Sequence, residues 1–486
     1  METSEMEINI LTRPETRQVG DGVFTVFDSE SAPADTGLIG RLGEGTEGTD
    51  LAAPPVVLPD FCHKEKSEMP SSIAVATQGA IRPTLTDAAL NCGMALVTLD
   101  VERPNAAAVT DFYRQVAQRF PSPPNWNRDL TSAEVLRAAT EGADFAAERY
   151  DLSDAELDRI EERGRMEIDS LGGSRRAKKE LPWVVRQMGR LRFGSIGPST
   201  HFLELQEVEE VLDPEAAERL GIQAGQVTLQ FHNGGGVLTG QIGALYARRK
   251  AASRMLRTEM SVQKPLTHLA TARSRRQLAS RLSNYFAEGC PSIPMSDDDG
   301  RRALLATRLS MNYGFAYRMA TYAALRSIAK GSFGATTRLV VDSPHNSVYE
   351  EEVAGKPAFV HRHNACRAFP AEMMADHPSF AETGQPLLLP GTNRTSSYLC
   401  IPGASADRSL YTACHGSGSI ISEFERSGRS STDPLGRRTA KYGYDGAAPA
   451  EVPHLDDNGV DEALGILSGH GLVRPVARMR PFAVLT

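Results

Sequence analysis

The amino-acid sequence predicts an α/β fold, because short β-prone runs and long helical segments alternate along the same chain. Three runs bounded by turn residues are typical of strands: IAVAT at 73–77, MALVTLD at 94–100 and THFLELQ at 200–206. A long helix is predicted over Arg301–Lys330, where apolar residues recur at helical spacing. The 486 residues suit either about three domains or one large α/β fold with insertions, and they can bury a sizeable core.

The composition is that of a globular protein and argues against several functional classes. Hydrophobic residues make up 41% of the chain and charged residues 23%. The formal net charge of -8 gives no general attraction to nucleic acid, so RNA would have to bind at a local basic patch. No apolar run approaches the roughly 18 residues of a membrane span, and Met1–Gly20 is too acidic and polar for a signal peptide. Six cysteines without a CxxC pair predict a reducing, cytoplasmic location.

The N-terminal part is expected to be a variable segment followed by the start of the main fold. Residues 1–55 show weak periodicity, with one expected strand at Gly22–Asp28. The β-prone runs of 56–100 suggest a sheet edge that leads to Cys92.

Helical and basic segments follow in the middle of the chain. Asn125–Ile168 is predicted to be helical, with a capping box formed by Ser153 and Glu156. Basic regions then occur at 175–192, 248–250 and 273–281. Such a run is usually a solvated face, and the alternative is contact with a phosphate backbone.

Strands and turns dominate the C-terminal part. A buried strand that begins at Arg338 is expected to end in His345 and Asn346, and Phe359–Pro370 is expected to be a polar loop. The stretch 385–403 predicts a strand, a turn and a second strand, and the chain closes with a short helix, a glycine turn and an arginine-flanked strand.

Four histidines and one cysteine stand in similar polar, turn-flanked settings, and they are the main functional signal. These residues are His201 in PSTHFLELQ, His232 in QFHNGGG, His345 in DSPHNS, His415 in ACHGSGS and Cys92 in LNCGM. A single histidine at the mouth of a strand is more often structural, but the recurrence favours one shared site. A thiolate with three imidazoles suits Zn, Mn, Fe or Co. Because no pair has HExxH or CxxC spacing, convergence in space is a prediction.

His415 differs from the other histidines because Gly416 and Gly418 follow it closely. The glycines leave room for a phosphate beside the imidazole and offer backbone amides to it. Histidine is a competent nucleophile for phosphoryl or nucleotidyl transfer. No Walker A loop and no GxGxxG after a strand is present, so a nucleotide would bind by another route. The residues alone predict a metal-assisted phosphoryl-transfer enzyme.

Several motifs, in order from about Leu58 to Thr486, resemble those of the RtcB-type RNA-splicing ligase family. GAIRPTLTDAALNCGM resembles the family's Cys-ligand segment, FGSIGPSTHFLELQ its GTLGSGNHFIE motif and FHNGGG its HSGSRG motif. The later matches are SPHNSVYEEE with VHRHNACRAFP, GQPLLLPGTNRTSSYL, TACHGSGS and RMRPFAVLT. The resemblance implies one large α/β domain over 56–486, with mixed sheets around a central metal and nucleotide cleft.

The resemblance also implies roles for individual residues. Two Mn²⁺ ions would be bound by Cys92, His201, His232 and His345, and His415 would take GMP from GTP. The residues expected around the guanylate are Thr200, His201, Phe202, Leu203, Glu204, His345, Asn346, Pro390, Gly391, Thr392, Asn393, Ser397, His415, Gly416, Ser417 and Gly418. The implied partner is RNA, whose 3'-phosphate or 2',3'-cyclic phosphate end is joined to a 5'-hydroxyl, and the protein is expected to be a monomer.

The sequence departs from the family pattern at several of these positions. The metal-binding Asp of the family falls on Ala89, with Asp87 two residues away. The Asn before the histidine motif is Thr200, the Arg after the nucleophile motif is Ser419, and the C-terminal Lys is Thr486. Two other readings therefore stay open: a metal-containing RNA-binding paralogue that has lost ligation, and a metal-dependent phosphohydrolase.

Overall fold

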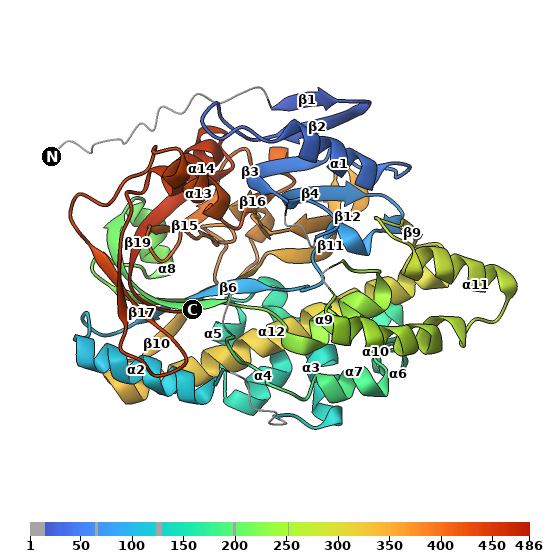
Figure 1. The fold of residues 1–486 in the computed structure, drawn as a ribbon, viewed down its shortest axis with the longest axis horizontal. Helices are drawn as coiled ribbons and strands as arrows, with labels where there is room; N and C mark the ends of the chain where they lie inside the picture. Colours follow the sequence, from blue (N-terminus) through green and yellow to red (C-terminus); the bar gives the residue numbers. More distant parts are fainter. Residues whose placement is uncertain (1–14, 64–66, 123–128, 198–200, 251) are drawn as a thin grey trace.

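A computed structural model describes residues 15–63, 67–122, 129–197, 201–250 and 252–486. It confirms the predicted α/β fold. Two large β-sheets form the body of the described part, and a layer of helices lies beneath the second sheet (Figure 1).

The first sheet joins N-terminal strands to strands from the C-terminal half. Its strand order is β1 (Thr16–Val19), β2 (Gly22–Val26), β3 (Val56–Cys62), β4 (Ser71–Thr77), β12 (Lys356–His363) and β11 (Asn346–Val353). The strand expected near Gly22 is confirmed as β2. It runs parallel to β3, with Thr25 paired to Val56, so the sheet crosses the predicted boundary at residue 55. The domain division itself stays a prediction.

The second sheet carries the residues singled out above. Its order is β10 (Thr337–Pro344), β6 (Gly93–Leu99), β8 (Val227–Asn233), β7 (Phe202–Val211), β19 (Val473–Leu485), β15 (Ser397–Pro402) and β14 (Leu387–Leu389), with β17 (Arg438–Tyr442) beside β19 and β18 (Ala450–Pro453) beside β17. The expectation of a sheet edge before Cys92 is wrong. β6 lies between β10 and β8, because β10, from far along the chain, pairs with its outer side.

The long helix predicted over Arg301–Lys330 is confirmed as α12 (Asp298–Phe333). Its first turn is acidic, which suits the positive end of the helix dipole, and it ends at Gly334 with a positive φ of 68°. It packs beneath the second sheet with α2 (Ala106–Arg119), α3 (Ser132–Glu141), α4 (Ala143–Tyr150) and α9 (Gly236–Tyr246) (Figure 1). The capping box of Ser153 and Glu156 is also confirmed, at the start of α5 (Asp154–Leu157).

The polar loop expected at Phe359–Pro370 is wrong in its first part. This stretch contains the end of β12 and β13 (Ala365–Arg367), which pairs with β16 (Thr412–Cys414). Its polar residues are buried and paired: Arg362 donates 2.6 Å and 2.9 Å hydrogen bonds to the two carboxylate oxygens of Glu351. A polar sequence can therefore form an internal strand where its charges find partners.

The remaining elements are short and connect these layers. They are α1 (Thr36–Thr46), β5 (Ala80–Ile81), α6 (Gly173–Glu180), α7 (Trp183–Met188), α8 (Pro214–Leu220), α10 (Arg254–Lys264), α11 (Arg275–Arg281), β9 (Ile293–Pro294), α13 (Gly418–Arg426) and α14 (Asn458–Gly469). Within the described ranges, no helix combines the length and the apolar character that crossing a membrane would require.

Candidate metal centre

Strand register brings the predicted ligand residues to one point of the second sheet. Met94 of β6 and Phe202 of β7 both pair with His232 of β8, and Pro344 of β10 pairs with Gly93. The predicted ligands occupy or adjoin these paired positions: Cys92, His201, His232 and His345.

The ligand atoms are close enough to share a metal ion. Cys92 Sγ lies 3.2 Å from His232 Nε2 and 3.7 Å from His201 Nε2, and the Nε2 atoms of His232 and His345 are 3.1 Å apart. The potential ligand atoms of Cys92, His232 and His345 all lie within 4.8 Å of one another. Thiolate and imidazole bonds to a metal are about 2.0–2.3 Å long, so donors at this spacing fit around one ion. The donor set therefore suits a borderline-soft divalent metal, and the ligand roles stay a prediction.

The turn before Cys92 is held by a buried ion pair between Arg318, on α12, and Asp342, on β10. Arg318 donates to both carboxylate oxygens of Asp342, at 2.6 Å and 2.9 Å, and also to the backbone oxygen and, at 3.0 Å, the side-chain oxygen of Asn91. Asn91 has a positive φ of 59°, and Gly314 makes room for it, since a Cβ on Gly314 would lie 2.7 Å from Asn91 Cβ. Arg318 thus fixes the turn that presents the cysteine.

His415 lies against this cluster. Its ring stacks on that of His345, with centroids 3.7 Å apart and an interplanar angle of 12°, and its centroid is 5.2 Å from that of His232. Its backbone N–H donates to Asn364 O, and α13 begins just beyond it at Gly418. The predicted nucleophile therefore lies beside the predicted ligands.

Asp60 is a residue of this region that the sequence patterns did not reveal. It follows Pro59 in β3 with a positive φ of 63°, and it accepts a 2.6 Å hydrogen bond from the backbone N–H of Ser419. One of its oxygens would lie 3.4 Å from a Cβ placed on Gly416. Asp60 thereby places a carboxylate against the glycine turn after His415, and as a residue inside β3 it carried no local signal of this contact.

The residues expected around the guanylate do not all face the same way. Glu204 is 4% exposed and accepts a 2.9 Å hydrogen bond from Gln206 Nε2, which also lies 3.4 Å from Ser397 Oγ. Leu203 is instead packed in the core on the helical side of the sheet, so only its backbone could serve a nucleotide. Thr200 lies outside the described residues.

Several of the other expected contact residues are bonded to one another or to the segment that carries Cys92. Ser397 Oγ accepts from the N–H of Gly391, and Ser417 Oγ donates 2.9 Å to Pro390 O. Asn346 Nδ2 donates to Ala89 O, which ties it to the Cys92 segment. Phe202 has its ring centroid 5.6 Å from that of His232. Thr392 and Asn393 lie half-buried in the turn between β14 and β15, and Gly416 and Gly418 border His415 in sequence.

Because position 89 is an alanine, it supplies no carboxylate to the cluster. Asp87 Oδ1 accepts a 2.8 Å hydrogen bond from the backbone N–H of Ala89, and Asp87 Oδ2 lies 4.0 Å from His363 Nε2. Ala89 and His201 line a cavity of about 440 Å³ whose other walls include Arg192 and the glycines of 234–236. Ala89 therefore lies in the wall of a cavity that reaches the predicted ligand His201.

Burial sets the charge states of two site residues. It lowers the pKa of His201, and the nearby positive charge of Arg192 lowers it further, so the imidazole is neutral and able to bind a metal. Burial also raises the pKa of Glu204 to about 7, because the ionised carboxylate is poorly solvated there.

Glu204 is expected to make the metal-free protein less stable as the pH rises. Its pKa is about 7 in the folded chain and 4.5 when unfolded, so its contribution is fully present below 4.5 and is lost as the pH rises to 7. The loss corresponds to about 3 kcal/mol. Urea unfolding in EDTA at about pH 5 and about pH 8 should show this dependence reduced in Glu204→Gln. An equal pH dependence in both proteins would contradict it.

Cys92→Ala is expected to weaken metal binding by about tenfold or more, because a thiolate ligand is lost. Metal per protein, measured by elemental analysis after dialysis, tests this. Cys290→Ala is the matched control, since Cys290 is a half-buried cysteine outside the cluster. Metal content unchanged in Cys92→Ala would show that the thiolate is not a ligand.

An α/β fold with a thiolate–imidazole cluster and an adjoining histidine defines a candidate metal-dependent enzyme. A family model described as tRNA-splicing ligase RtcB matches residues 50–486. The chain therefore belongs to the RtcB family, which confirms the resemblance drawn from the motifs.

Relatives with known names agree with this assignment. The chain is 28% identical over 418 residues to a tRNA-splicing ligase RtcB of Pyrococcus horikoshii, an alignment that covers 81% of this chain and 44% of the relative. It is 27% identical to a tRNA-splicing ligase RtcB of Thermococcus kodakarensis, covering 84% and 82%. It is 28% identical to an RNA-splicing ligase RtcB of Mycobacterium tuberculosis, covering 84% and 90%. The chain thus spans less than half of the Pyrococcus relative.

Proposed function

We propose that this protein is a GTP- and Mn-dependent RNA ligase that joins a 3'-phosphate or 2',3'-cyclic phosphate end to a 5'-hydroxyl. The observation that carries the proposal is the position of His415, stacked on His345 at the edge of the Cys–His cluster. The family assignment and the names of the relatives support the same reading.

The chain's own residues would bind and orient the reactants. Cys92, His201, His232 and His345 would hold Mn²⁺, which when bound supplies neutralisation of phosphate charge. The guanylate would lie between Glu204 and the glycine turn after His415, whose remaining backbone amides would be donors to its phosphate. Because its pKa is about 7, Glu204 is present in both the protonated and the ionised form at neutral pH. It can therefore donate a hydrogen bond to a base or accept one from it.

His415 would act as the nucleophile in the first step. A ring nitrogen attacks the α-phosphorus of GTP, a phosphorus–nitrogen bond forms, and pyrophosphate leaves. An oxygen of the RNA 3'-phosphate then attacks the same phosphorus, which frees His415 and leaves GMP on the RNA end. The 5'-hydroxyl finally attacks the activated 3'-phosphate, forms the phosphodiester and releases GMP. A 2',3'-cyclic phosphate would first be opened by water.

Incubation of the purified protein with Mn²⁺ and GTP labelled at the α-phosphate tests the proposal. A covalent labelled protein is expected, followed by loss of label when RNA with a 3'-phosphate is added. Absence of any adduct would contradict the ligase mechanism.

A second candidate, a metal-containing RNA-binding paralogue that has lost ligation, is favoured by Ala89. The position expected to hold a carboxylate ligand carries a methyl group, and Asp87 is bonded to the Ala89 backbone. RNA binding without an adduct would select this candidate. Hydrolysis of a phosphate ester without an adduct would instead select a metal-dependent phosphohydrolase.

Ala89→Asp is expected to strengthen Mn²⁺ binding, because an anionic oxygen suits this hard ion. The Mn²⁺ concentration for half-maximal adduct formation should fall by about tenfold or more. Ala89→Asn is the matched control, since it has the same size without the charge. Coincident Mn²⁺ titrations of the unaltered chain and Ala89→Asp would show that Asp87 or a water already fills the position.

A further inference from the structure

A second cavity lies outside the site described above, at the C-terminal end of α9. It has a volume of about 720 Å³ and lies among α9, α10 and the segment 286–289. The cations that line it are Arg248, Arg249, Lys250, Arg257 and Lys264, and the acids are Glu68 and Glu288. The walls therefore carry more positive than negative charge.

Two of these cations are deeply buried. Arg249 is 7% exposed; it donates to the backbone oxygens of Thr86 and Pro83, at 2.8 Å and 2.7 Å, and its Nε has no hydrogen-bond partner among the described residues. Lys264 is also 7% exposed and donates 2.8 Å to Ala247 O. Buried cations are costly unless an anion balances them.

The two acids balance only part of this charge. Glu68 forms a buried ion pair with Arg249, 3.4 Å from Nη1, and its other oxygen accepts the backbone N–H of Lys250. Glu288 pairs with Arg248 at 2.6 Å. Burial, and then the charges of Arg249 and Arg248, lower the pKa of Lys264 to about 7. An anion in the cavity would relieve this repulsion.

The other walls are apolar and leave space beside the cations. They are formed by Ala244, Ala247, Ala252, Met260, Pro265 and Phe286. A volume of this size suits a small organic molecule better than a lone inorganic ion. The charge and the apolar walls together fit a ligand with a phosphate at one end and an apolar or planar body.

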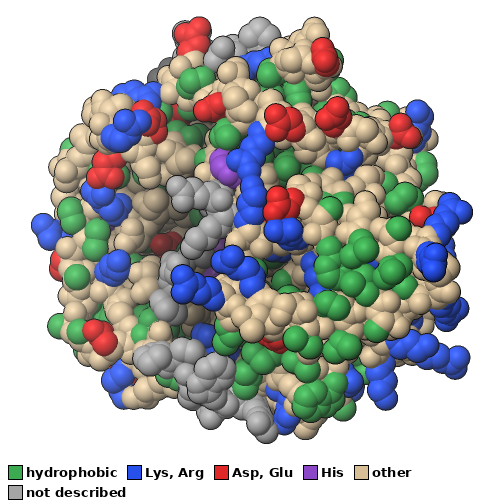
Figure 2. All heavy atoms as spheres, turned by 45° about the vertical axis from the view of Figure 1, so that its right-hand side comes forward, with side chains coloured by type: hydrophobic (Ala, Val, Ile, Leu, Met, Phe, Trp, Pro, Cys, Tyr) green, Lys and Arg blue, Asp and Glu red, His purple; other side chains and the backbone are tan. Residues whose placement is uncertain are grey.

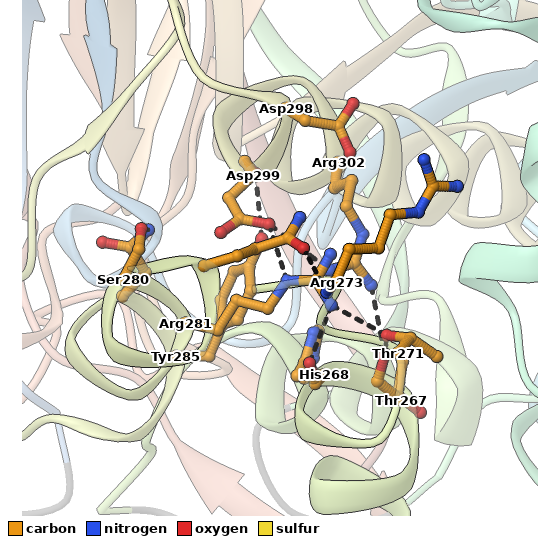
Figure 3. Close-up of polar contacts among 12 residues, drawn as sticks. Thr267, His268, Thr271, Arg273, Ser280, Arg281, Tyr285, Asp298, Asp299 and Arg302 are labelled. Atoms are coloured by element: carbon orange, nitrogen blue, oxygen red, sulfur yellow. Dashed lines mark hydrogen bonds and ion pairs between the residues drawn. The ribbon is translucent and has the colours of Figure 1, made fainter. Parts of the chain in front are cut away.

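The segments that adjoin the cavity are tied to α12 by buried contacts. Arg281 of α11 donates 3.0 Å to Asp299 of α12 and 2.7 Å to His268 O, and Tyr285 OH donates 2.9 Å to Asp299 O (Figure 3). Arg302 of α12 is paired with Glu180 at 3.0 Å. These buried contacts fasten α11 and the turn at 265–269, which follows α10, to α12. They hold the segment next to the cavity in place without a ligand.

The surroundings are strongly basic. Residues 248–281 contain ten Lys or Arg and one acid, Glu259, in a chain of net charge -8. Figure 2 turns the side with α10 and α11 toward the reader and shows Lys and Arg side chains gathered around hydrophobic ones. A surface with this excess of positive charge attracts polyanions.

We propose that this cavity binds the phosphate of a nucleotide, either free or as one unit of an RNA strand. α9 begins beside the metal cluster and its 11 residues span about 16 Å before reaching the cavity. An RNA strand leaving the site could therefore reach it. The idea that the phosphate belongs to an RNA strand rests on the proposed ligase function. The idea that the cavity binds a phosphate does not.

Calorimetric titration with sulfate, a phosphate mimic of constant charge, tests the cavity on the full chain. Lys264→Gln and Lys250→Gln are each expected to weaken sulfate binding by about tenfold, the cost of a charge-assisted hydrogen bond. Lys250 is exposed, so its variant should fold even if Lys264→Gln does not. Lys441→Gln, an exposed lysine on β17, is the matched control. Equal sulfate affinity in the cavity variants and the control would overturn the proposal.

Competition experiments then identify the source. Displacement of sulfate by GMP supports a free nucleotide, and displacement by a short oligouridylate but not GMP supports an RNA strand. Sulfate binding that neither probe displaces would overturn the nucleotide assignment. Adduct formation in the unaltered chain reports on the ligase function separately, so failure of one proposal is distinguished from failure of the other.

Discussion

Replacing His415 with alanine is expected to abolish the covalent nucleotide adduct, by at least about a thousandfold, while bound metal stays nearly unchanged. His415 stacks on His345 but is not part of the cluster of Cys92, His232 and His345. Loss of its imidazole would remove the proposed nucleophile without removing a predicted ligand. Labelled adduct and metal per protein, measured on one preparation, test both parts.

His361 and His363 are the alternative candidates for the nucleophile, and the structure argues against the first of them. His361 is fully buried; its Nε2 accepts the backbone N–H of Arg82 and its Nδ1 donates 3.0 Å to Phe359 O. Both of its ring nitrogens are therefore engaged. His363 is the remaining neighbour to test, and a labelled adduct that persists in His415→Ala but is lost in His363→Ala would move the nucleophile there. Loss of metal in His415→Ala would make it a ligand instead.

The strands and the positions of the site residues were largely predictable from local patterns. β-prone runs bounded by turns located β4, β6 and β7, and helical spacing located α12. The histidine settings predicted a common site because each residue lies near one end of a strand, beside small residues. The order of the family motifs strengthened this prediction, because it assigned distant segments such as LNCGM and DSPHNS to one site. In the structure these two segments adjoin the paired strands β6 and β10.

Long-range partners were not predictable from those patterns. Nothing local to β6 indicates that β10 covers its outer side, and nothing in the polar run of β12 indicates that Arg362 forms an ion pair with Glu351 of β11. Asp60 contacts Ser419 across most of the chain. These contacts depend on register between distant strands, which is decided by the whole packed fold rather than by a window of sequence.

Arg318 is another residue whose long-range partner the sequence did not indicate. Replacing it is expected to have the largest effect on stability. Helical spacing placed it on α12 without indicating its partner. Arg318→Met is expected to destabilise the fold by about 3–5 kcal/mol, because Asp342 would remain charged in a fully buried position. Urea unfolding of the metal-free protein measures this.

The double variant Arg318→Met/Asp342→Leu separates the two roles of the arginine. Replacing both charges by apolar groups should recover most of the lost stability. Metal affinity should stay reduced, because the backbone and side-chain oxygens of Asn91 have lost their donor and no longer fix the turn before Cys92. Metal affinity restored together with stability would show that Arg318 only neutralises Asp342, and that the packing of Gly314 against Asn91 suffices to place the cysteine.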